Sequence, residues 1–131
     1  MKVGLDTSVV LRLLVGQPAD QAQRAVAFLD ELSRRGDQPV VADLVVAEVY
    51  FALQHHYGVS KKDAIEGLGH LFAAREIEST GYAAEVLKTE GLASARPGFI
   101  DRLIHKDYIE GGGSMATFEK EGARLKSVRV L

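Results

Sequence analysis

The first forty residues alternate between strand-like apolar runs and helix-like apolar spacing. Residues 2–5 form a short apolar run that predicts a buried strand, and residues 9–15 predict a short apolar helix. From 19 to 35 apolar residues recur every three or four positions, as on one face of an amphipathic helix. A glycine follows each of these two helical segments and is expected to end it. Residues 39–42 predict a second short strand.

The rest of the chain continues this alternation. Asp43 is expected to cap a helix that runs to about Tyr57, and Ser60 opens a capping box for a helix that ends near Arg75. The remaining predicted elements are a strand at 76–79, helices at 82–94 and 99–109, a glycine turn at 111–113, a strand at 114–118, a short helix at 119–125 and a strand at 128–131.

Strands that alternate with helices predict an α/β fold. We expect a single domain over residues 1–131, with three α/β/α layers around a central, mostly parallel sheet of four to five strands. In such sheets ligands bind beyond the carboxyl ends of the strands. This rule selects Asp6, which follows the first strand, and Glu119, which follows the strand at 114–118.

Glu48 is the most unusual acidic residue of the chain. It is the only charged residue between Leu44 and Leu53, in a helix that is apolar almost all round and is therefore expected to be buried. A buried carboxylate is costly unless it is paired or neutralised. Glu48 is thus a candidate site residue; the alternatives are a narrow exposed stripe on the helix or pairing with one buried arginine.

The other acidic candidates have structural explanations as well as functional ones. Asp101 follows the apolar residues Phe99 and Ile100 and can be a solvent-facing residue of a first helical turn. Asp6 can be a helix N-cap, and Glu119 a first-turn carboxylate of the last helix. Their order along an α/β chain favours a shared site, because the topology can bring all four to one sheet edge.

A cluster of four carboxylates needs a cation, because like charges at close range repel. The chain has no cysteine, and oxygen ligands without nearby histidine favour Mg²⁺ or Mn²⁺ over Zn²⁺. Such a metal polarises a phosphate, activates a water and stabilises the leaving oxygen, which suits hydrolysis of phosphodiesters.

Composition and charge add limits to this interpretation. The 47% hydrophobic content supports a sizeable core. No apolar run reaches the ~20 residues of a membrane span, and Asp6 interrupts the start too early for a signal peptide. A cytoplasmic protein without a membrane partner is therefore expected. The formal net charge of −2 is unusual for a nucleic-acid binder, although bound cations would offset a carboxylate-lined site.

Four ordered motifs together resemble the PIN-domain nucleases, and most closely the VapC-type toxins of toxin–antitoxin pairs. The motifs are Val-Gly-Leu-Asp-Thr-Ser at 3–8, Ala-Glu-Val at 47–49, Phe-Ile-Asp at 99–101 and Thr-Phe-Glu-Lys at 117–120. Each motif is short, but the ordered set is fairly specific and covers essentially the whole chain.

The resemblance implies a PIN-like fold and an Mg²⁺- or Mn²⁺-dependent endoribonuclease that cleaves RNA. It implies a homodimer and inhibition by a cognate VapB-type antitoxin. The family's acidic positions fall on residues that would act as catalytic groups and metal ligands, with two hydroxyl residues in support: Asp6, Glu48, Asp101 and Glu119, then Thr7 and Thr117.

One departure from the family pattern leaves an alternative open. The last acidic position is usually Asp, whereas this chain has Glu119, whose side chain is one methylene longer. The alternative is a catalytically weak PIN-like module that acts in binding. A phosphatase of the haloacid-dehalogenase type is disfavoured, because Ser8 stands where that family has a second Asp. His55 and His56 are interpreted as polar residues of a helix end, since no zinc-ligand spacing accompanies them.

Overall fold

The structure, a computed structural model, describes residues 1–74 and 76–131. Helices and strands alternate along it, with two short 3₁₀ helices. In chain order the elements are β1 (Lys2–Gly4), α1 (Thr7–Val15), α2 (Ala19–Arg35), β2 (Gln38–Val41), α3 (Asp43–His55), α4 (Lys61–Ala74), β3 (Glu78–Ser79), α5 (Ala83–Val86), η1 (Leu92–Ser94), α6 (Phe99–Glu110), β4 (Met115–Thr117), η2 (Lys120–Arg124) and β5 (Val128–Val130).

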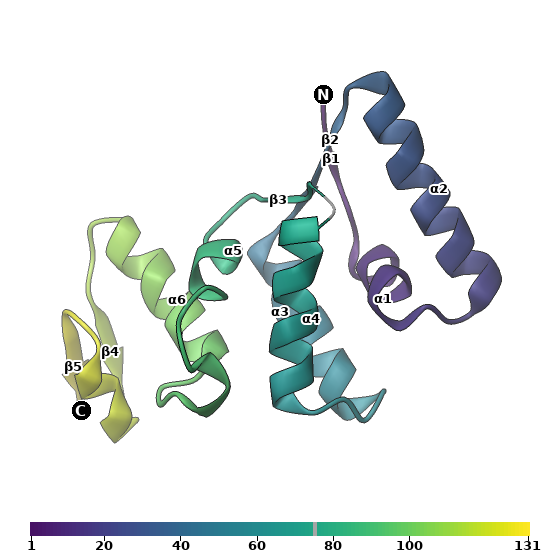
Figure 1. Cartoon of the computed structure of the whole chain (residues 1–131). Coiled ribbons are helices and arrows are strands. Elements are labelled where there is room, and N and C mark those ends of the chain that lie inside the picture. The colour runs from purple at the N-terminus through teal and green to yellow at the C-terminus, as the bar shows by residue number, and fades with distance from the viewer. Residues whose placement is uncertain (75) are drawn as a thin grey trace.

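The N-terminal part contains a three-stranded parallel sheet in the order β1-β2-β3 (Figure 1). Its register pairs Gly4 with Val40, and Val40 in turn with Glu78. Helix α1 packs against α2, α3 and α4, and α2 also contacts β2. Parallel strands are joined by helical crossovers that must cover the sheet, so this arrangement follows from the alternation in the sequence.

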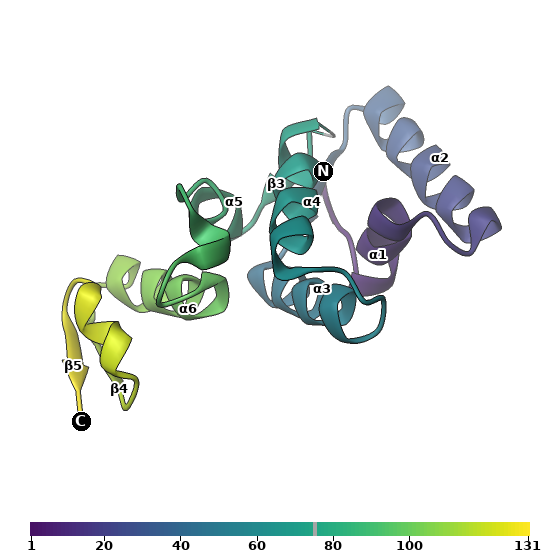
Figure 2. The ribbon, with the colours of Figure 1, turned by 60° about the horizontal axis from the view of Figure 1, so that its bottom comes forward.

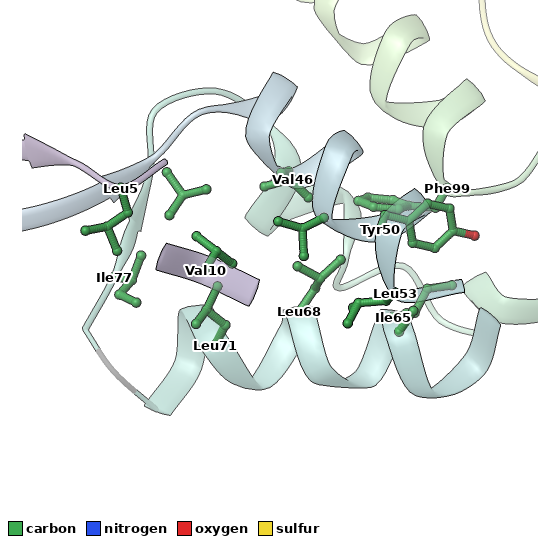
Figure 3. Packing of buried hydrophobic residues seen from close by; sticks show 14 of the residues in the cluster. Leu5, Val10, Val46, Tyr50, Leu53, Ile65, Leu68, Leu71, Ile77 and Phe99 are labelled. Atoms are coloured by element: carbon green, nitrogen blue, oxygen red, sulfur yellow. The ribbon is translucent and has the colours of Figure 1, made fainter. Parts of the chain in front are cut away.

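The core lies between this sheet and the helices α1, α3 and α4. Val10, Val46 and Leu68 have no exposed surface, and they pack in one apolar cluster with Leu5 and Ile77 (Figure 3). The apolar spacing of each helix places these residues on its inner face. The same cluster continues along α3 to Tyr50, whose ring meets the ring of Phe99 edge-on at 5.2 Å between centroids.

Residues 99–131, here called the C-terminal arm, extend away from the three-stranded sheet. Figures 1 and 2 show β4 and β5 at the opposite end of the molecule from α1 and α2. The two strands form a separate parallel sheet in which Met115 pairs with Val128 and Thr117 with Val130. A hydrogen bond of 2.7 Å between His105 Nε2 and the Lys126 carbonyl ties this sheet to α6.

The predicted α/β class agrees with this mixture of helices and parallel strands, but the strands do not form one central sheet. Residues 1–74 and 76–131 contain five strands, divided into a three-stranded and a two-stranded sheet. The physical reason lies at the base of the arm, where Phe99 is buried against Tyr50 of α3. Because α6 begins at this contact and carries β4 with it, β4 is held away from β1.

Several local predictions also need correction. Asp43 does not cap α3, whose N-cap is Ala42; its carboxylate instead accepts hydrogen bonds from the backbone N–H groups of Tyr82 and Ala83, at the start of α5. The helix predicted at 82–94 is divided into α5 and η1, and the last predicted helix is the 3₁₀ helix η2. The predicted end of α4 at Arg75 lies outside the described residues, within which α4 ends at Ala74.

None of the helices in residues 1–74 and 76–131 is both long and apolar enough to cross a lipid bilayer.

Candidate active site

Asp6 and Glu48 form the first of two acidic pairs. Asp6 lies just beyond the carboxyl end of β1, as predicted, and is the N-cap residue of α1, although its side chain makes no capping hydrogen bond. Thr7, the next residue, donates a hydrogen bond of 3.1 Å from Oγ1 to Oε1 of Glu48 on α3. The hydroxyl predicted to support the first acid therefore links it to the second. We call Asp6 and Glu48 the β1 pair.

Glu48 is exposed, so the expectation that it is buried was wrong. It lies on the outer stripe of α3, between Leu44, which is 74% exposed, and Phe51. The spacing of four and three residues places these three side chains on one helical face. The stripe was the alternative explanation of the sequence pattern, but it carries large apolar side chains on both sides of the carboxylate, which is unusual for a surface that faces water.

Asp101 and Glu119 form the second pair, on the C-terminal arm. Both line a surface cavity of about 480 Å³ between the end of α3 and the arm. Asp101 lies in the first turn of α6, where the helix dipole favours a carboxylate. Glu119 lies two residues beyond the end of β4, and its backbone N–H donates a 3.1 Å hydrogen bond to Oγ1 of Thr117. We call Asp101 and Glu119 the arm pair.

Gly122 fixes the local conformation around Glu119. It is buried, and a Cβ atom at this position would come within 2.7 Å of Cγ2 of Thr117 and 3.3 Å of Cγ1 of Val128. A side chain at residue 122 would therefore push η2 away from β4 and β5. The close packing of this glycine holds Glu119 at the end of β4, where the sequence pattern predicted it.

The two acidic pairs do not meet within one chain. Glu48 and Asp6 lie outside the cavity that Asp101 and Glu119 line. Across residues 1–74 and 76–131, no group of three or more His, Cys, Asp or Glu side chains is arranged to hold a metal ion. The donor chemistry matches Mg²⁺ or Mn²⁺, which bind carboxylate oxygens. The geometry of the single chain, however, does not fit the predicted four-carboxylate metal centre.

Sequence reasoning missed the basic and aromatic residues that border the arm pair. Lys61 and Arg96 line the same cavity as Asp101. His55, interpreted from the sequence as a polar helix end, stacks on Phe51 with 6.3 Å between ring centroids and 19° between ring planes. The spacing of four residues between Phe51 and His55 was the available signal, because it places both rings on one helical face.

Tyr50 closes the inner wall of the cavity. Burial raises the pKa of its phenol, and a hydrogen bond with Gln54 opposes part of this effect. The phenol therefore stays neutral and can donate a hydrogen bond at physiological pH. The cavity therefore combines a neutral hydrogen-bond donor, two basic side chains and a stacked pair of rings.

In comparisons with known proteins, no family model, no curated protein and no solved structure matches this chain.

Proposed function

We propose that this protein is an Mg²⁺- or Mn²⁺-dependent endoribonuclease that acts as the toxin of a toxin–antitoxin pair. The proposal includes a PIN-like architecture for the assembled protein and hydrolysis of RNA phosphodiesters at Asp6, Glu48, Asp101 and Glu119. Thr7 and Thr117 are positioning residues in this proposal. The partners are an RNA substrate, a VapB-type antitoxin and a second copy of the chain.

One observation carries the proposal: the arm pair, chosen from sequence order, lies in a cavity with basic and aromatic side chains of the kinds that suit RNA. The arm pair shares its cavity with Lys61 and Arg96, which are suited to phosphate oxygens. It also shares it with the stacked rings of Phe51 and His55, on which an unpaired base can stack. Carboxylates and basic groups in one cavity are expected where a phosphate and a cation are bound together.

The basic and aromatic groups supply what an acidic site lacks. An acidic pair repels the phosphate backbone, and the formal charge of the whole chain is −2. Lys61 and Arg96 counter this repulsion at the cavity, and aromatic stacking holds a base without regard to charge. In this proposal the cavity orients a single-stranded segment of RNA, and Thr7, the residue after Asp6, holds the Glu48 carboxylate through its hydrogen bond.

The direct test is cleavage of RNA by the purified protein with Mg²⁺ or Mn²⁺. Wild-type protein is expected to cleave single-stranded RNA, and Asp6→Asn and Asp101→Asn are expected to abolish cleavage. Asp20→Asn, on the exposed first turn of α2, is the matched control and is expected to retain full activity. Full cleavage by both Asp6→Asn and Asp101→Asn would contradict the proposal.

A genetic test addresses the toxin role. Expression of the chain alone is expected to arrest growth, and co-expression of a small neighbouring DNA-binding protein is expected to relieve the arrest. Expression of Asp101→Asn is the control and should not arrest growth. Arrest that is equal for wild type and Asp101→Asn would separate toxicity from nuclease activity and contradict the toxin mechanism.

A second candidate function is a catalytically weak PIN-like module that acts in binding. The observation that favours it is the lack, among the described residues, of any group of three potential metal ligands. Calorimetric titration with Mg²⁺ and Mn²⁺ discriminates between the two functions. Saturable binding that Asp6→Asn abolishes favours the nuclease, and no binding at millimolar metal favours the binding module.

A further inference from the structure

In the described structure each of the two sheets has two edge strands, β1 and β3 in one sheet and β4 and β5 in the other. β1 pairs with β2 alone, and β4 pairs with β5 alone. An exposed strand edge presents unpaired backbone groups that attract another strand, and an isolated two-stranded sheet is only marginally stable. All strands in both sheets run parallel, and parallel sheets are normally covered on both faces.

We infer that two copies of the chain exchange their C-terminal arms, so that β4 of each copy pairs in parallel with β1 of the other. The exchange forms two five-stranded sheets in the order β3-β2-β1-β4-β5, with β4 and β5 from the second copy. It also brings the β1 pair of one copy next to the arm pair of the other. The joining of the two acidic pairs into one site rests on the proposed function, whereas the pairing of β4 with β1 can be tested without it.

Backbone hydrogen bonds show which groups of β1 are free. The Leu5 N–H donates to the Val40 carbonyl, and the Met1 carbonyl accepts from the Gln38 N–H. Because successive residues of a strand direct their backbone groups to opposite edges, Lys2 and Gly4 direct theirs away from β2. In the same way, the Met115 N–H and the Thr117 carbonyl are bonded to β5, and the backbone groups of Ala116 between them point to the free edge of β4.

These free groups select the register. In a parallel pair, a residue that bonds across the interface lies opposite one that does not, as Val40 lies opposite Gly4 between β1 and β2. Alignment of the strand ends then pairs Gly4 with Thr117 and Lys2 with Met115. Two residues further along the chain, Asp6 is level with Glu119.

The faces of the two strands match in this register. Leu5, buried in the core, lies level with Phe118, which is 80% exposed in the single chain. The exchange therefore places the most exposed phenylalanine on the core face of the sheet. On the opposite face, Gly4 lies level with Thr117, and a Cβ atom at Gly4 would contact nothing within 4 Å in the single chain. The open space around Gly4 in the single chain would accept a larger residue. A glycine is expected at such a position where another element packs closely against the backbone.

Charge complementarity also favours the exchange. The β1 pair presents two carboxylates at the end of β1, and no basic side chain is bonded to either within the described residues. Residues 114–131 of the arm are basic in balance, with four basic side chains against two acidic ones. They are Lys120, Arg124, Lys126 and Arg129, against Glu119 and Glu121. Asp6 and Glu48 of one copy thus meet residues 114–131 of the other, in which basic side chains outnumber the acidic ones.

The occupant of the β1 edge is a second copy because the chain's own arm is held elsewhere. Phe99 at the base of the arm is buried against Tyr50. Lys106 Nζ bridges Glu85 of α5 at 3.2 Å and Glu110 of α6 at 3.1 Å, which fixes α6 on α5. The β4–β5 sheet is in turn held on α6 by the hydrogen bond between His105 and Lys126, and exchange between copies keeps all of these contacts. Each copy donates and receives the same arm, so the dimer closes with two-fold symmetry.

Cross-linking of single-cysteine variants tests the exchange, because the natural chain contains no cysteine. Lys2→Cys and Met115→Cys are purified separately, mixed, partly unfolded and refolded together, and then treated with a short bifunctional maleimide. We expect a covalent dimer of twice the 14.2 kDa chain mass in the mixture and little product from either variant alone. The double variant Lys2→Cys/Met115→Cys is expected to cross-link between chains.

An edge-blocking variant provides the matched control. Ala116→Pro removes the N–H at the free edge of β4, while the β5 ladder, which uses Met115 and Thr117, is retained. We expect this variant to run as a folded monomer on size-exclusion chromatography and to lose the cross-link. Ala116→Thr keeps the N–H and is expected to remain dimeric. Circular dichroism verifies that both variants are folded.

Three results would overturn the exchange. A cross-link within the double-variant monomer would mean that each chain closes its own sheet. A cross-link in Lys2→Cys alone that is as strong as in the mixture would mean that β1 edges pair with each other. A monomeric wild type at millimolar concentration would exclude a second copy as the partner. None of these readouts depends on RNA cleavage, so a dimer that passes them without nuclease activity would contradict only the proposed function.

Discussion

The N-terminal part and the C-terminal arm use the same kind of strand but differ in how they are buried. Around the three-stranded sheet, α1, α3 and α4 supply fully buried residues such as Val10, Val46 and Leu68. In residues 99–131, which are all described, Phe99 and Leu103 are the buried hydrophobic residues. The position of the arm thus depends on the contact of Phe99 with α3, and the positions of Asp101 and Glu119 depend on the arm. Stability and chemistry are therefore unevenly distributed along the chain.

Phe99→Ala tests the anchor and is expected to have the largest effect. Truncation of a buried aromatic side chain costs about 3–5 kcal/mol in the free energy of unfolding, since it removes the contact with Tyr50. Tyr108→Ala on the exposed side of the same helix is the control, with an expected change within about 0.5 kcal/mol. Urea denaturation followed by circular dichroism measures both. Equal costs for the two variants would contradict the anchor.

Asp43→Ala tests the connection between α3 and α5. The carboxylate accepts hydrogen bonds of 3.0 to 3.1 Å from the N–H groups of Tyr82 and Ala83, and its loss is expected to cost about 1–3 kcal/mol. Amide hydrogen exchange should accelerate at both residues. Asp20→Ala, in the first turn of α2, removes only a helix-dipole interaction worth about 0.3–1 kcal/mol. Unchanged exchange at residues 82 and 83 in Asp43→Ala would show that the cap is unimportant.

Two glycine-to-alanine substitutions, one in each region, are expected to change the stability of the protein in opposite directions. Gly122→Ala is expected to destabilise the arm by about 1–3 kcal/mol, because the new methyl group collides with Thr117. Gly69→Ala on α4 meets nothing within 4 Å and is expected to stabilise the helix by about 0.5–1 kcal/mol. Thermal unfolding measures both. A Gly122→Ala variant as stable as wild type would show that the packing of η2 on β4 is loose.

The smallest expected effects concern the dependence of stability on pH. Stability is expected to fall at acid pH through Asp37 (the acid limb) and at alkaline pH through Lys106 (the alkaline limb). Hydrogen bonds from Arg35 and then from the N-terminal amine lower the pKa of Asp37 below its ordinary value of 3.8. Its contribution is therefore present above that value and is lost as pH falls through the lower folded pKa. Glu110 and then Glu85 raise the pKa of Lys106 above 10.5, so its contribution is present below 10.5 and is lost as pH rises further.

Each limb belongs to one region of the molecule. Asp37→Asn is expected to flatten the acid limb and leave the alkaline limb unchanged, whereas Lys106→Met is expected to do the reverse. Urea titrations at a series of pH values measure both limbs. Both interactions are largely exposed, so the changes should shrink in high salt. An acid limb that Lys106→Met alone removes would contradict this assignment.

The elements of the fold followed well from the sequence because they depend on local patterns. Periodic apolar residues and terminal glycines located α2 between Ala19 and Arg35, as the structure has it. The joining of strands did not follow, since it depends on distant contacts. No local pattern indicates that burial of Phe99 against Tyr50 holds β4 away from β1.

The site was predicted in its parts but not in its arrangement. The strand-end rule placed Asp6 and Glu119 correctly at the ends of β1 and β4, and Thr7 does contact Glu48. Glu48 was expected to be buried because its helix is apolar all round. The structure instead exposes it beside the apolar side chains of Leu44 and Phe51. The apolar pattern of α3 alone does not distinguish a helix buried all round from one that carries apolar side chains on its exposed face.

Complementation between inactive variants tests the central claim, that the acids of two copies form one site. Asp6→Asn and Asp101→Asn are each expected to be inactive alone. When they refold together, the exchanged heterodimer contains one site with all four natural carboxylates, so the mixture should regain about a quarter of the wild-type RNA cleavage. A mixture that stays inactive, although wild type cleaves RNA and the two variants cross-link as a dimer, would contradict the account.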